Sequence, residues 1–314
     1  MGLFSKAKRK DGGLTIAMCG DGLVAASVRR VEAAKPVVEL SVFHPVKDAL
    51  AVEALSKLGK ETHAANYRCG TLLGGSDYQI VAVEAPNVPP EELKTAVRWR
   101  LKDMLDFHVD DATIDVLDIP VDKNAPVRNH TMFAIAARNS VVEARQNLFT
   151  VAGIALGVID IPEMAQRNIS ALMEPAGRGL AMLSFNHEGG LLTVSFNAEL
   201  YLARRIDVTL AQLMAPDSEK QHVCHDKITL ELQRSLDHFD RQFHFITVAK
   251  LMLAPTGAPG LLEYLAGNLY MPVEAFDLAD VLDLDKVPEL LEVAQQQRCF
   301  LALGAALRLE EVVL

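Results

Sequence analysis

Two short glycine-rich turns carry the strongest candidate chemistry in this sequence. Gly20-Asp21-Gly22 and Glu188-Gly189-Gly190 each separate two apolar runs, and glycine lets backbone amides approach a phosphate group closely. Asp21 adds a carboxylate of the kind that Mg²⁺ prefers as a ligand. However, Asp-Gly between apolar runs is also a strong β-hairpin signal, and such a turn needs no ligand. Both interpretations, a phosphate-binding turn and a purely structural one, are open at this level.

A second cluster of chemically active side chains lies at His222-Val-Cys224-His225. Three possible ligands fall within four residues, but the spacing matches no zinc signature, so we expect loop and packing residues and no metal site. The sequence contains no Gly-x-Ser-x-Gly turn, no P-loop and no Gly-x-Gly-x-x-Gly motif. Its four cysteines form no CxxC pair, which predicts reduced thiols. They are Cys19, Cys69, Cys224 and Cys299.

Length and charge restrict the class of protein. With 314 residues, half of them apolar, the chain can form roughly two domains with sizeable cores. The 31 basic residues face 41 acidic ones, a net charge of -10, so nucleic acid is a poor partner. No window reaches the roughly 20 apolar residues of a membrane span, and we expect a cytoplasmic protein. Residues 1–12 form a basic tail, either a frayed end or a segment attracted to an anionic membrane surface.

The order of predicted elements indicates two α/β lobes. Apolar runs at 14–19, 23–28 and 37–43 predict a three-strand meander, and runs at 180–185, 191–196 and 200–206 predict a second one. Helices and strands alternate after each meander. We therefore expect an internal duplication of topology, with a first lobe at 13–175, a second lobe at 176–314, and an extra subdomain inserted in the first lobe at about 86–160.

A predicted helix in this extra subdomain begins at Pro89 and carries the only tryptophan. Leu93, Val97, Leu101 and Met104 share one face and are expected to be buried. Trp99 falls roughly opposite that stripe, among polar residues that include Lys102 and Asp106. Trp99 either packs against the next strand or anchors an apolar partner. Arg98, Arg100 and Lys102 form either a solvated face or a rim that meets acidic groups.

Several short sequence segments, spread in order over the chain, resemble the PilM family, whose members have the actin-like ATPase fold. In the first half the words are Met1-Gly-Leu-Phe-Ser-Lys, Glu92-Leu-Lys-Thr-Ala-Val-Arg-Trp99, Phe107-His-Val-Asp-Asp111 and Phe133-Ala-Ile-Ala-Ala-Arg138. In the second half they are Leu230-Glu-Leu-Gln-Arg-Ser-Leu-Asp-His-Phe239, Gly260-Leu-Leu-Glu-Tyr-Leu265 and Ala302-Leu-Gly-Ala-Ala-Leu-Arg308. The resemblance is greatest to the branch that serves the mannose-sensitive haemagglutinin pilus.

The resemblance implies a cytoplasmic protein at the periphery of the inner membrane, within a type IV pilus assembly platform. Its implied activity is to bind the cytoplasmic N-terminal segment of a PilN-like bitopic membrane protein. The implied peptide groove includes residues 89–119, with Arg98, Trp99, Lys102 and Asp106 as candidate partner-binding residues. A homodimer is possible. The cytoplasmic domain of type II secretion platform proteins is a related alternative.

The nucleotide-binding motifs of the PilM family are degenerate in this sequence. Its Gly-Ile-Asp-Ile word aligns with 15–18, where Ala17 replaces the carboxylate, and its Asp-Ile-Gly word aligns with Ser184, Phe185 and Asn186. Its Ser-Gly-Gly-Gly word aligns with 254–257, where Pro255 removes an N–H donor. Loss of both carboxylates disfavours Mg²⁺ binding, although Asp21 is a partial substitute.

We therefore expect a non-catalytic scaffold with no cofactor and a vestigial nucleotide cleft. The cleft is expected near Ala17, Gly20, Asp21, Gly22, Ser184, Asn186 and Gly257. Two alternatives remain at this level. The first is an ATPase or small-molecule kinase that uses ATP and Mg²⁺, and the second is a filament-forming protein that senses nucleotide.

Overall fold

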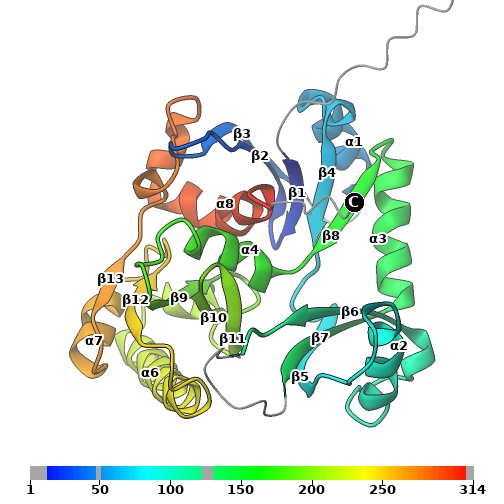
Figure 1. The fold of residues 1–314 in the computed structure, drawn as a ribbon. Coiled ribbons are helices and arrows are strands. Elements are labelled where there is room, and N and C mark those ends of the chain that lie inside the picture. The colour runs from blue at the N-terminus through cyan, green and yellow to red at the C-terminus, as the bar shows by residue number, and fades with distance from the viewer. Residues whose placement is uncertain (1–12, 47–50, 122–129, 309–314) are drawn as a thin grey trace, which may run out of the picture.

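The computed structural model describes residues 13–46, 51–121 and 130–308. It contains two lobes, each built on a five-stranded sheet, and a three-stranded sheet inserted into the first lobe (Figure 1). The expected basic tail at 1–12 lies outside the described residues. Within the described ranges, none of the helices combines the length and the apolar character that a membrane crossing requires.

The first lobe is organised around a mixed sheet with the strand order β3-β2-β1-β4-β8. Strands β1, β2 and β3 pair antiparallel, and β4 and β8 add parallel strands beside β1. Leu14 and Ile16 point to helices α1 and α3, and the alternate residue Ala17 points to the opposite face. The elements are β1 (Gly13–Cys19), β2 (Gly22–Arg29), β3 (Val37–Pro45), α1 (Ala51–Glu61), β4 (Arg68–Leu72), α3 (Asn139–Val151) and β8 (Leu156–Asp160), with a 3₁₀ turn at Ala64–Asn66.

The second lobe repeats this topology with the strand order β11-β10-β9-β12-β13. An antiparallel meander is again followed by parallel strands, which confirms the expected duplication. Its elements are α4 (Pro162–Ser170), β9 (Gly179–Phe185), β10 (Gly190–Phe196), β11 (Glu199–Ile206), α5 (Leu210–Leu213), α6 (Ser218–Gln242), β12 (Val248–Leu253), α7 (Leu261–Asn268), β13 (Val273–Ala275) and α8 (Val293–Ala306), with 3₁₀ turns at Leu278–Asp280 and Pro288–Leu291.

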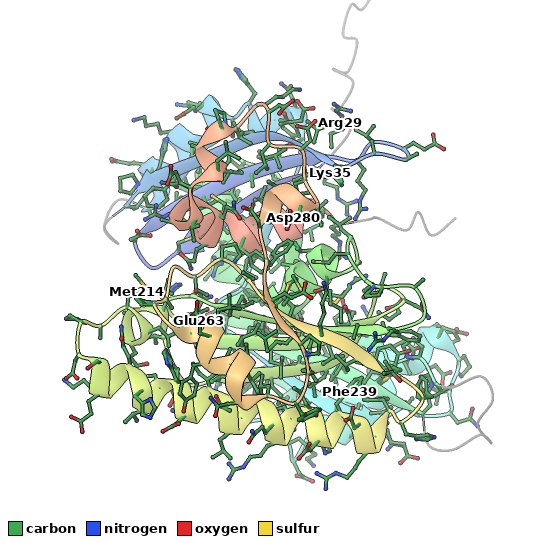
Figure 2. The ribbon with its side chains drawn as sticks, turned by 90° about the vertical axis from the view of Figure 1, so that its left-hand side faces the viewer. Arg29, Lys35, Met214, Phe239, Glu263 and Asp280 are labelled. Atoms are coloured by element: carbon green, nitrogen blue, oxygen red, sulfur yellow. The ribbon has the colours of Figure 1, made fainter. Side chains whose placement is uncertain are left out.

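Long helix α6 lies along the outer side of the second lobe (Figure 2). Its apolar stripe packs on β9 to β11 through Ile228, Leu232, Leu236 and Phe239, all of which are almost fully buried. Asp217 caps the helix, because its carboxylate accepts from the amides of Glu219 and Lys220. The spacing of these four side chains by four, four and three residues places them on one face of the helix.

Helices α4 and α8 cross between the lobes and form the layer between the two large sheets. Helix α8 comes from the end of the chain but packs on β1, β2 and β4 of the first lobe, whereas α4 packs on β9, β10 and β11 of the second. The two helices touch closely, since a β-carbon on Gly304 would lie 2.2 Å from the carbonyl oxygen of Ala165. Helix α4 therefore precedes the expected boundary at 175/176 but packs on the sheet of the second lobe. Helix α8 follows that boundary but packs on the sheet of the first lobe.

The inserted subdomain is a small sheet with the order β5-β7-β6 and one covering helix. Alternate residues of β7 face α2 on one side and the core of the second lobe on the other. The sheet begins eight residues before the expected boundary at 86, because β5 belongs to it, and β8 inside the expected range belongs to the large sheet. Its elements are β5 (Tyr78–Glu84), α2 (Pro90–Leu101), β6 (Ala112–Asp118) and β7 (Thr131–Arg138), with a 3₁₀ turn at Val109–Asp111.

Candidate functional site

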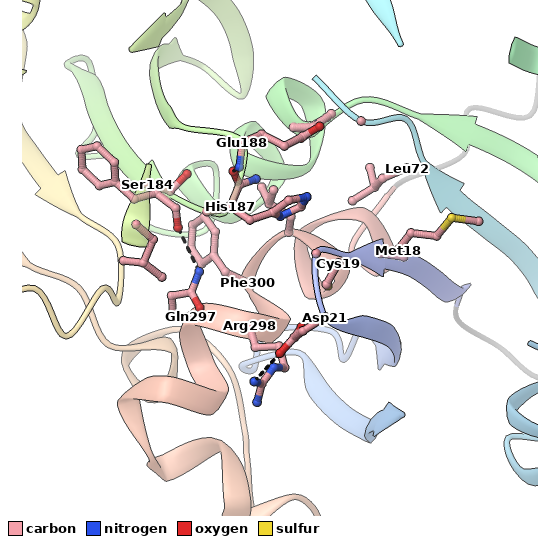
Figure 3. A pocket seen from close by; sticks show the side chains of 18 of the residues that line it. Met18, Cys19, Asp21, Leu72, Ser184, His187, Glu188, Gln297, Arg298 and Phe300 are labelled. Carbon is pink, nitrogen blue, oxygen red and sulfur yellow. Dashed lines mark hydrogen bonds and ion pairs between the residues drawn. The ribbon is translucent and has the colours of Figure 1, made fainter. Parts of the chain in front are cut away.

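A cleft of about 740 Å³ lies between the two lobes (Figure 3). The β1–β2 turn and the end of β4 line it from the first lobe, and the β9–β10 turn and α5 line it from the second. Helix α8 closes its base with Gln297, Arg298 and Phe300. Of the residues expected near a vestigial nucleotide cleft, Ala17, Gly20, Asp21, Ser184 and Asn186 line this cavity, whereas Gly22 does not. A former nucleotide site here stays a prediction.

The first turn is held by contacts within the protein. The Arg298 guanidinium donates to the Asp21 carboxylate at 2.9 Å and lies 4.1 Å from the ring centroid of Phe43. Gly22 is required by packing, because a β-carbon there would lie 2.2 Å from the carbonyl oxygen of His44 on β3. Asp21, the one acidic substitute that the sequence offers, is thus already paired with a cation.

In the second glycine turn, between β9 and β10, two backbone amides already donate hydrogen bonds within the turn. The side-chain oxygen of Asn186 accepts from the amides of Glu188 at 2.8 Å and Gly189 at 3.1 Å. Ser184 donates to Gln166 at 2.5 Å inside a buried network, and Phe185 is buried against Gly190. A phosphate at this turn would have to displace the Asn186 side chain, because backbone amides bind anions only when they are free to donate.

The two turns also touch each other across the cleft. A β-carbon on Gly20 would lie 2.8 Å from Cγ of His187, so the imidazole packs directly on the first turn. The Glu188 carboxylate accepts from the amide of Gly75 in the β4–β5 loop, with both oxygens at 2.9 Å. Side chains of the second lobe therefore lie in the gap between the glycine turns.

Of the third expected nucleotide element, residues 254–257, only Pro255 lines the cleft. Gly257 has a left-handed φ of 66° and does not line the cavity, whereas Pro255 does. Thr256 accepts from the amide of Ala258 at 3.0 Å and so closes a local turn. The expectation that Gly257 lies at the cleft is corrected by this geometry, because the loop turns away after Pro255.

A buried polar cluster beside the cleft has no signal in the sequence. Glu163 is fully buried and accepts from the hydroxyl of Tyr78 and from Arg205, the latter at 3.1 Å. Burial, and then the Glu163 charge, raise the pKa of Tyr78 well above its usual value. Tyr78 and Arg205 lie in different sheets, so only the three-dimensional fold brings these groups together.

Burial also controls the cysteine in the cleft. Desolvation, followed by the neighbouring Cys299 and Asp21, raises the pKa of Cys19 to about 12. The thiol is therefore protonated at neutral pH, and a protonated thiol is a poor nucleophile. Among the described residues no group of His, Cys, Asp and Glu has the geometry of a metal site.

The candidate partner-binding residues lie on and after α2 of the inserted subdomain. Trp99 is 71% exposed, so the alternative in which it packs against the next strand is wrong for the described part of the chain. Arg98 donates to the carbonyl oxygens of Val109 and Ala112, at 2.5 and 3.0 Å, and thereby holds the following turn. Its role toward a partner stays a prediction beside this internal one.

The rest of this surface is polar and open. Lys102 is exposed, and Asp106 lies 3.5 Å from Arg138, whose guanidinium stacks on Phe107 at 4.4 Å. Val97 and Leu101 are buried as expected and Leu93 is partly buried beside them, but Met104 is 48% exposed. The expectation for Met104 is wrong because α2 ends at Leu101 and the helical spacing no longer applies.

The His222-Val-Cys224-His225 cluster is part of helix α6 and packs against α7. His225 is buried and its ring lies 5.2 Å from that of Tyr264, which also meets His222 at 5.4 Å. Tyr264 donates to Asp226. Burial lowers the pKa of His225. His222 and His225 thus pack against α7, as the packing interpretation predicted, but the expectation of a loop is wrong because α6 already begins at Ser218.

Comparisons with known proteins agree with this architecture. No family model and no curated protein matches the sequence. Among solved structures, a PilM-PilN type IV pilus biogenesis complex matches with a TM-score of 0.72 at 19% identity, covering 94% of this chain and 97% of that one. A Bacteroides thetaiotaomicron protein with an actin-like ATPase fold and unknown function matches with a TM-score of 0.50 at 11% identity, covering 93% and 99%.

A third match is the cytoplasmic domain of EpsL, an inner-membrane component of the Vibrio cholerae type II secretion system. Its TM-score is 0.43 at 16% identity, over 66% of this chain and 76% of that domain. The full-length matches define the class: this chain has the actin-like, two-lobed α/β fold with an extra subdomain inserted in the first lobe.

Proposed function

We propose that this protein is a non-catalytic scaffold of a type IV pilus inner-membrane platform and that it binds the cytoplasmic N-terminal segment of a PilN-like membrane protein. The observation that carries the proposal is the likeness in fold, over nearly the whole of both chains, to a protein of a PilM-PilN complex. In this proposal the protein acts in the cytoplasm, at the periphery of the inner membrane. The particular assignment is to MshI of the mannose-sensitive haemagglutinin pilus.

The inserted subdomain offers a surface for such a partner. A tryptophan is seldom so exposed to solvent on a protein surface. Aromatic side chains that become buried on binding contribute much of the binding free energy at many interfaces. Trp99 is 71% exposed, with Met104 at 48% nearby in sequence and Lys102 beside them. These residues would supply an apolar anchor with a cationic rim for a peptide that carries acidic groups.

The contacts in the cleft support a scaffold that does not use nucleotide. Asp21 is paired with Arg298, and Asn186 occupies two amides of the second turn. The cleft lining holds the carboxylates of Asp21, Asp77 and Glu188 against two guanidiniums, a formal charge of -1. A triphosphate would meet net negative charge, and the carboxylates that could hold Mg²⁺ are already hydrogen-bonded.

The partner is tested with a synthetic peptide of the N-terminal cytoplasmic segment of the PilN-like protein from the same organism, titrated by fluorescence anisotropy. We expect micromolar binding and a loss of about tenfold or more for Trp99→Ala, since aromatic anchors contribute about 2 kcal/mol or more. Tyr270→Ala is the matched control, because Tyr270 is also exposed, at 63%, but lies on the second lobe. Equal affinities for the two variants would remove Trp99 from the site.

The ATPase alternative has its own test. Isothermal titration with Mg-ATP, together with a phosphate-release assay, measures nucleotide binding and turnover directly. The scaffold proposal expects neither. Micromolar ATP binding or hydrolysis that is lost in Asp21→Asn would overturn the non-catalytic part of the proposal, while the peptide experiment would still decide the partner.

A further inference from the structure

A groove of about 610 Å³ lies beside the turn between β2 and β3 of the first lobe. Residues of this turn form one wall, and the segment that precedes α8 forms the other. The walls are joined, because the Lys35 ammonium donates to the carbonyl oxygen of Ala279 at 2.8 Å and Val37 forms a parallel bridge with Asp283. Two segments far apart in the sequence therefore build one groove.

The floor of this groove is apolar. Val31 and Val37 line it from the turn, and Leu282, Leu284 and Leu291 line it from the other wall. Leu282 and Leu284 are buried in the core, whereas Leu291 is 62% exposed. Such an open leucine beside a hollow is apolar surface that a further side chain can cover. The groove can therefore accept apolar side chains.

The rim of the groove is acidic. Residues 277–292 carry six carboxylates and one lysine, and that lysine, Lys286, already pairs with a carboxylate of β3 at 2.5 Å. Three exposed carboxylates of this wall form no ion pair within the described part of the chain, namely Asp280, Asp285 and Glu289. Opposite charges attract across an interface and fix its orientation. The groove thus fits a segment that combines apolar with basic side chains.

The first residues of this same chain have that composition. Leu3 and Phe4 are followed by four basic residues, Lys6, Lys8, Arg9 and Lys10. Residues 1–12 lie outside the described part of the chain, but the residue at which they join the fold, Gly13, is described. The position of Gly13 therefore decides whether they can reach the groove.

Gly13 lies at the end of the sheet that carries the groove. Gly13 pairs with Val28 of β2, Val28 pairs with Val38 of β3, and the adjoining Val37 pairs with Asp283 of the groove wall. Three steps between neighbouring strands amount to about 15 Å. The nine residues from 4 to 12 span up to about 30 Å when extended. The segment is long enough to reach the groove.

We propose that residues 3–10 bind in this groove of their own chain, with Leu3 and Phe4 on the apolar floor and the basic side chains beside the acidic rim. In the bound state the basic residues are withheld from an anionic membrane surface, to which they would otherwise be attracted. The proposal does not depend on the pilus assignment, because it uses only the groove, the charges and the position of Gly13.

Photo-crosslinking of the full chain tests the contact directly. The photoreactive residue p-benzoylphenylalanine replaces Phe4, and peptide mapping after irradiation locates the attached residue. We expect cross-links to residues 31–37 and 279–291, in a product that keeps the mass of a single chain. Cross-links that are absent, or confined to other surfaces, would overturn the proposal. A product of twice the mass would place the segment on a second copy and would equally contradict binding within one chain.

A pair of matched variants tests the role of the rim. Asp285→Lys/Glu289→Lys reverses two exposed charges and is expected to lower the yield of the groove cross-link by about threefold or more. Asp237→Lys/Asp240→Lys is the control, because it changes the net charge equally at exposed positions of α6. Figure 2 shows this helix at the opposite end of the molecule from Lys35. An equal yield in the two variants would show that the acidic rim does not hold the segment.

Vesicle binding separates the docked segment from one that is always free to meet a membrane. The full chain and both double variants are sedimented with vesicles of phosphatidylcholine and phosphatidylglycerol. Release of the segment from the reversed rim should make the groove variant bind about threefold or more tighter than the α6 variant, which has the same net charge. Equal vesicle binding by the two variants would show that the groove withholds nothing and would overturn the proposal.

Discussion

The hydroxyl group of Tyr78 donates a hydrogen bond to the carboxylate of Glu163, and these two residues belong to different parts of the fold. Tyr78 begins β5 of the inserted sheet, whereas Glu163 lies in the first turn of the crossing helix α4. Arg205 of β11 completes the cluster by donating to the other carboxylate oxygen and by lying 4.7 Å from the centroid of the Tyr78 ring. The inserted subdomain, the crossing helices and the second sheet are therefore joined at one buried point.

Tyr78→Phe removes a hydrogen bond to a buried charge. Such bonds contribute about 1.5–3 kcal/mol, and the Glu163 carboxylate would lose one of its two side-chain partners. We expect a fall of about 2 kcal/mol in the free energy of unfolding, seen as a lower midpoint in urea with an unchanged slope. Tyr270→Phe, at an exposed position, is the control and should leave the midpoint in place. Equal midpoints for both variants would show that the cluster contributes nothing measurable.

The same tyrosine predicts a pH dependence. Burial and the Glu163 charge hold the pKa of Tyr78 well above the usual value of 10.0. Between the unfolded and the folded pKa the unfolded chain loses the Tyr78 proton and the folded chain keeps it, so the Tyr78 contribution to stability is complete below about pH 10 and is lost as pH rises. The stability difference between the natural protein and Tyr78→Phe should therefore be larger at about pH 8 than at about pH 11. A difference that grows with pH would contradict the raised pKa.

The crossing of α4 and α8 depends on a small residue. A β-carbon on Gly304 would lie 2.2 Å from the carbonyl oxygen of Ala165 and 3.2 Å from its Cα, and backbone atoms at this distance cannot rotate away. We expect Gly304→Ala to lower the free energy of unfolding by about 1–3 kcal/mol. Gly267→Ala in α7 is the matched control, because nothing lies within 4 Å of its added β-carbon and alanine is the better helix former. Thermal unfolding of the two variants decides the point, and a Gly304→Ala variant as stable as the natural protein would show that the helices separate freely.

Much of the fold could be predicted from the sequence, because its local patterns agree with the final packing. The apolar runs at 14–19 and 180–185 predicted the strands β1 and β9, in which most residues are buried. Local signals failed where a non-local contact decides the outcome. The boundary of the inserted sheet is one such case, since the antiparallel pairing of β5 with β7 follows from no pattern within β5 itself.

At the candidate site, too, local sequence motifs could be interpreted, whereas contacts between residues far apart in the sequence could not be predicted. Ala17 and Ser184, which stand at the degenerate nucleotide motifs, both line the inter-lobe cleft, and the former binding of nucleotide there stays a prediction. The pairing of Asp21 with Arg298, however, joins residues 277 positions apart, and no spacing rule relates them. Met104 was misplaced for the opposite reason, because the helical period was extended past the last residue of α2.

Glu188 supplies the last prediction, which concerns the connection between the lobes. Its carboxylate accepts from the amide of Gly75 and so ties the second glycine turn to the β4–β5 loop without a nucleotide. In Glu188→Ala the Gly75 amide loses this acceptor, and a more open amide exchanges its hydrogen faster. We expect faster deuterium uptake in peptides that cover residues 73–77, with little change in peptides of α6. Glu231→Ala, which removes a carboxylate on the outer helix α6, is the control, and equal uptake in this loop for the two variants would show that Glu188 does not restrain the β4–β5 loop.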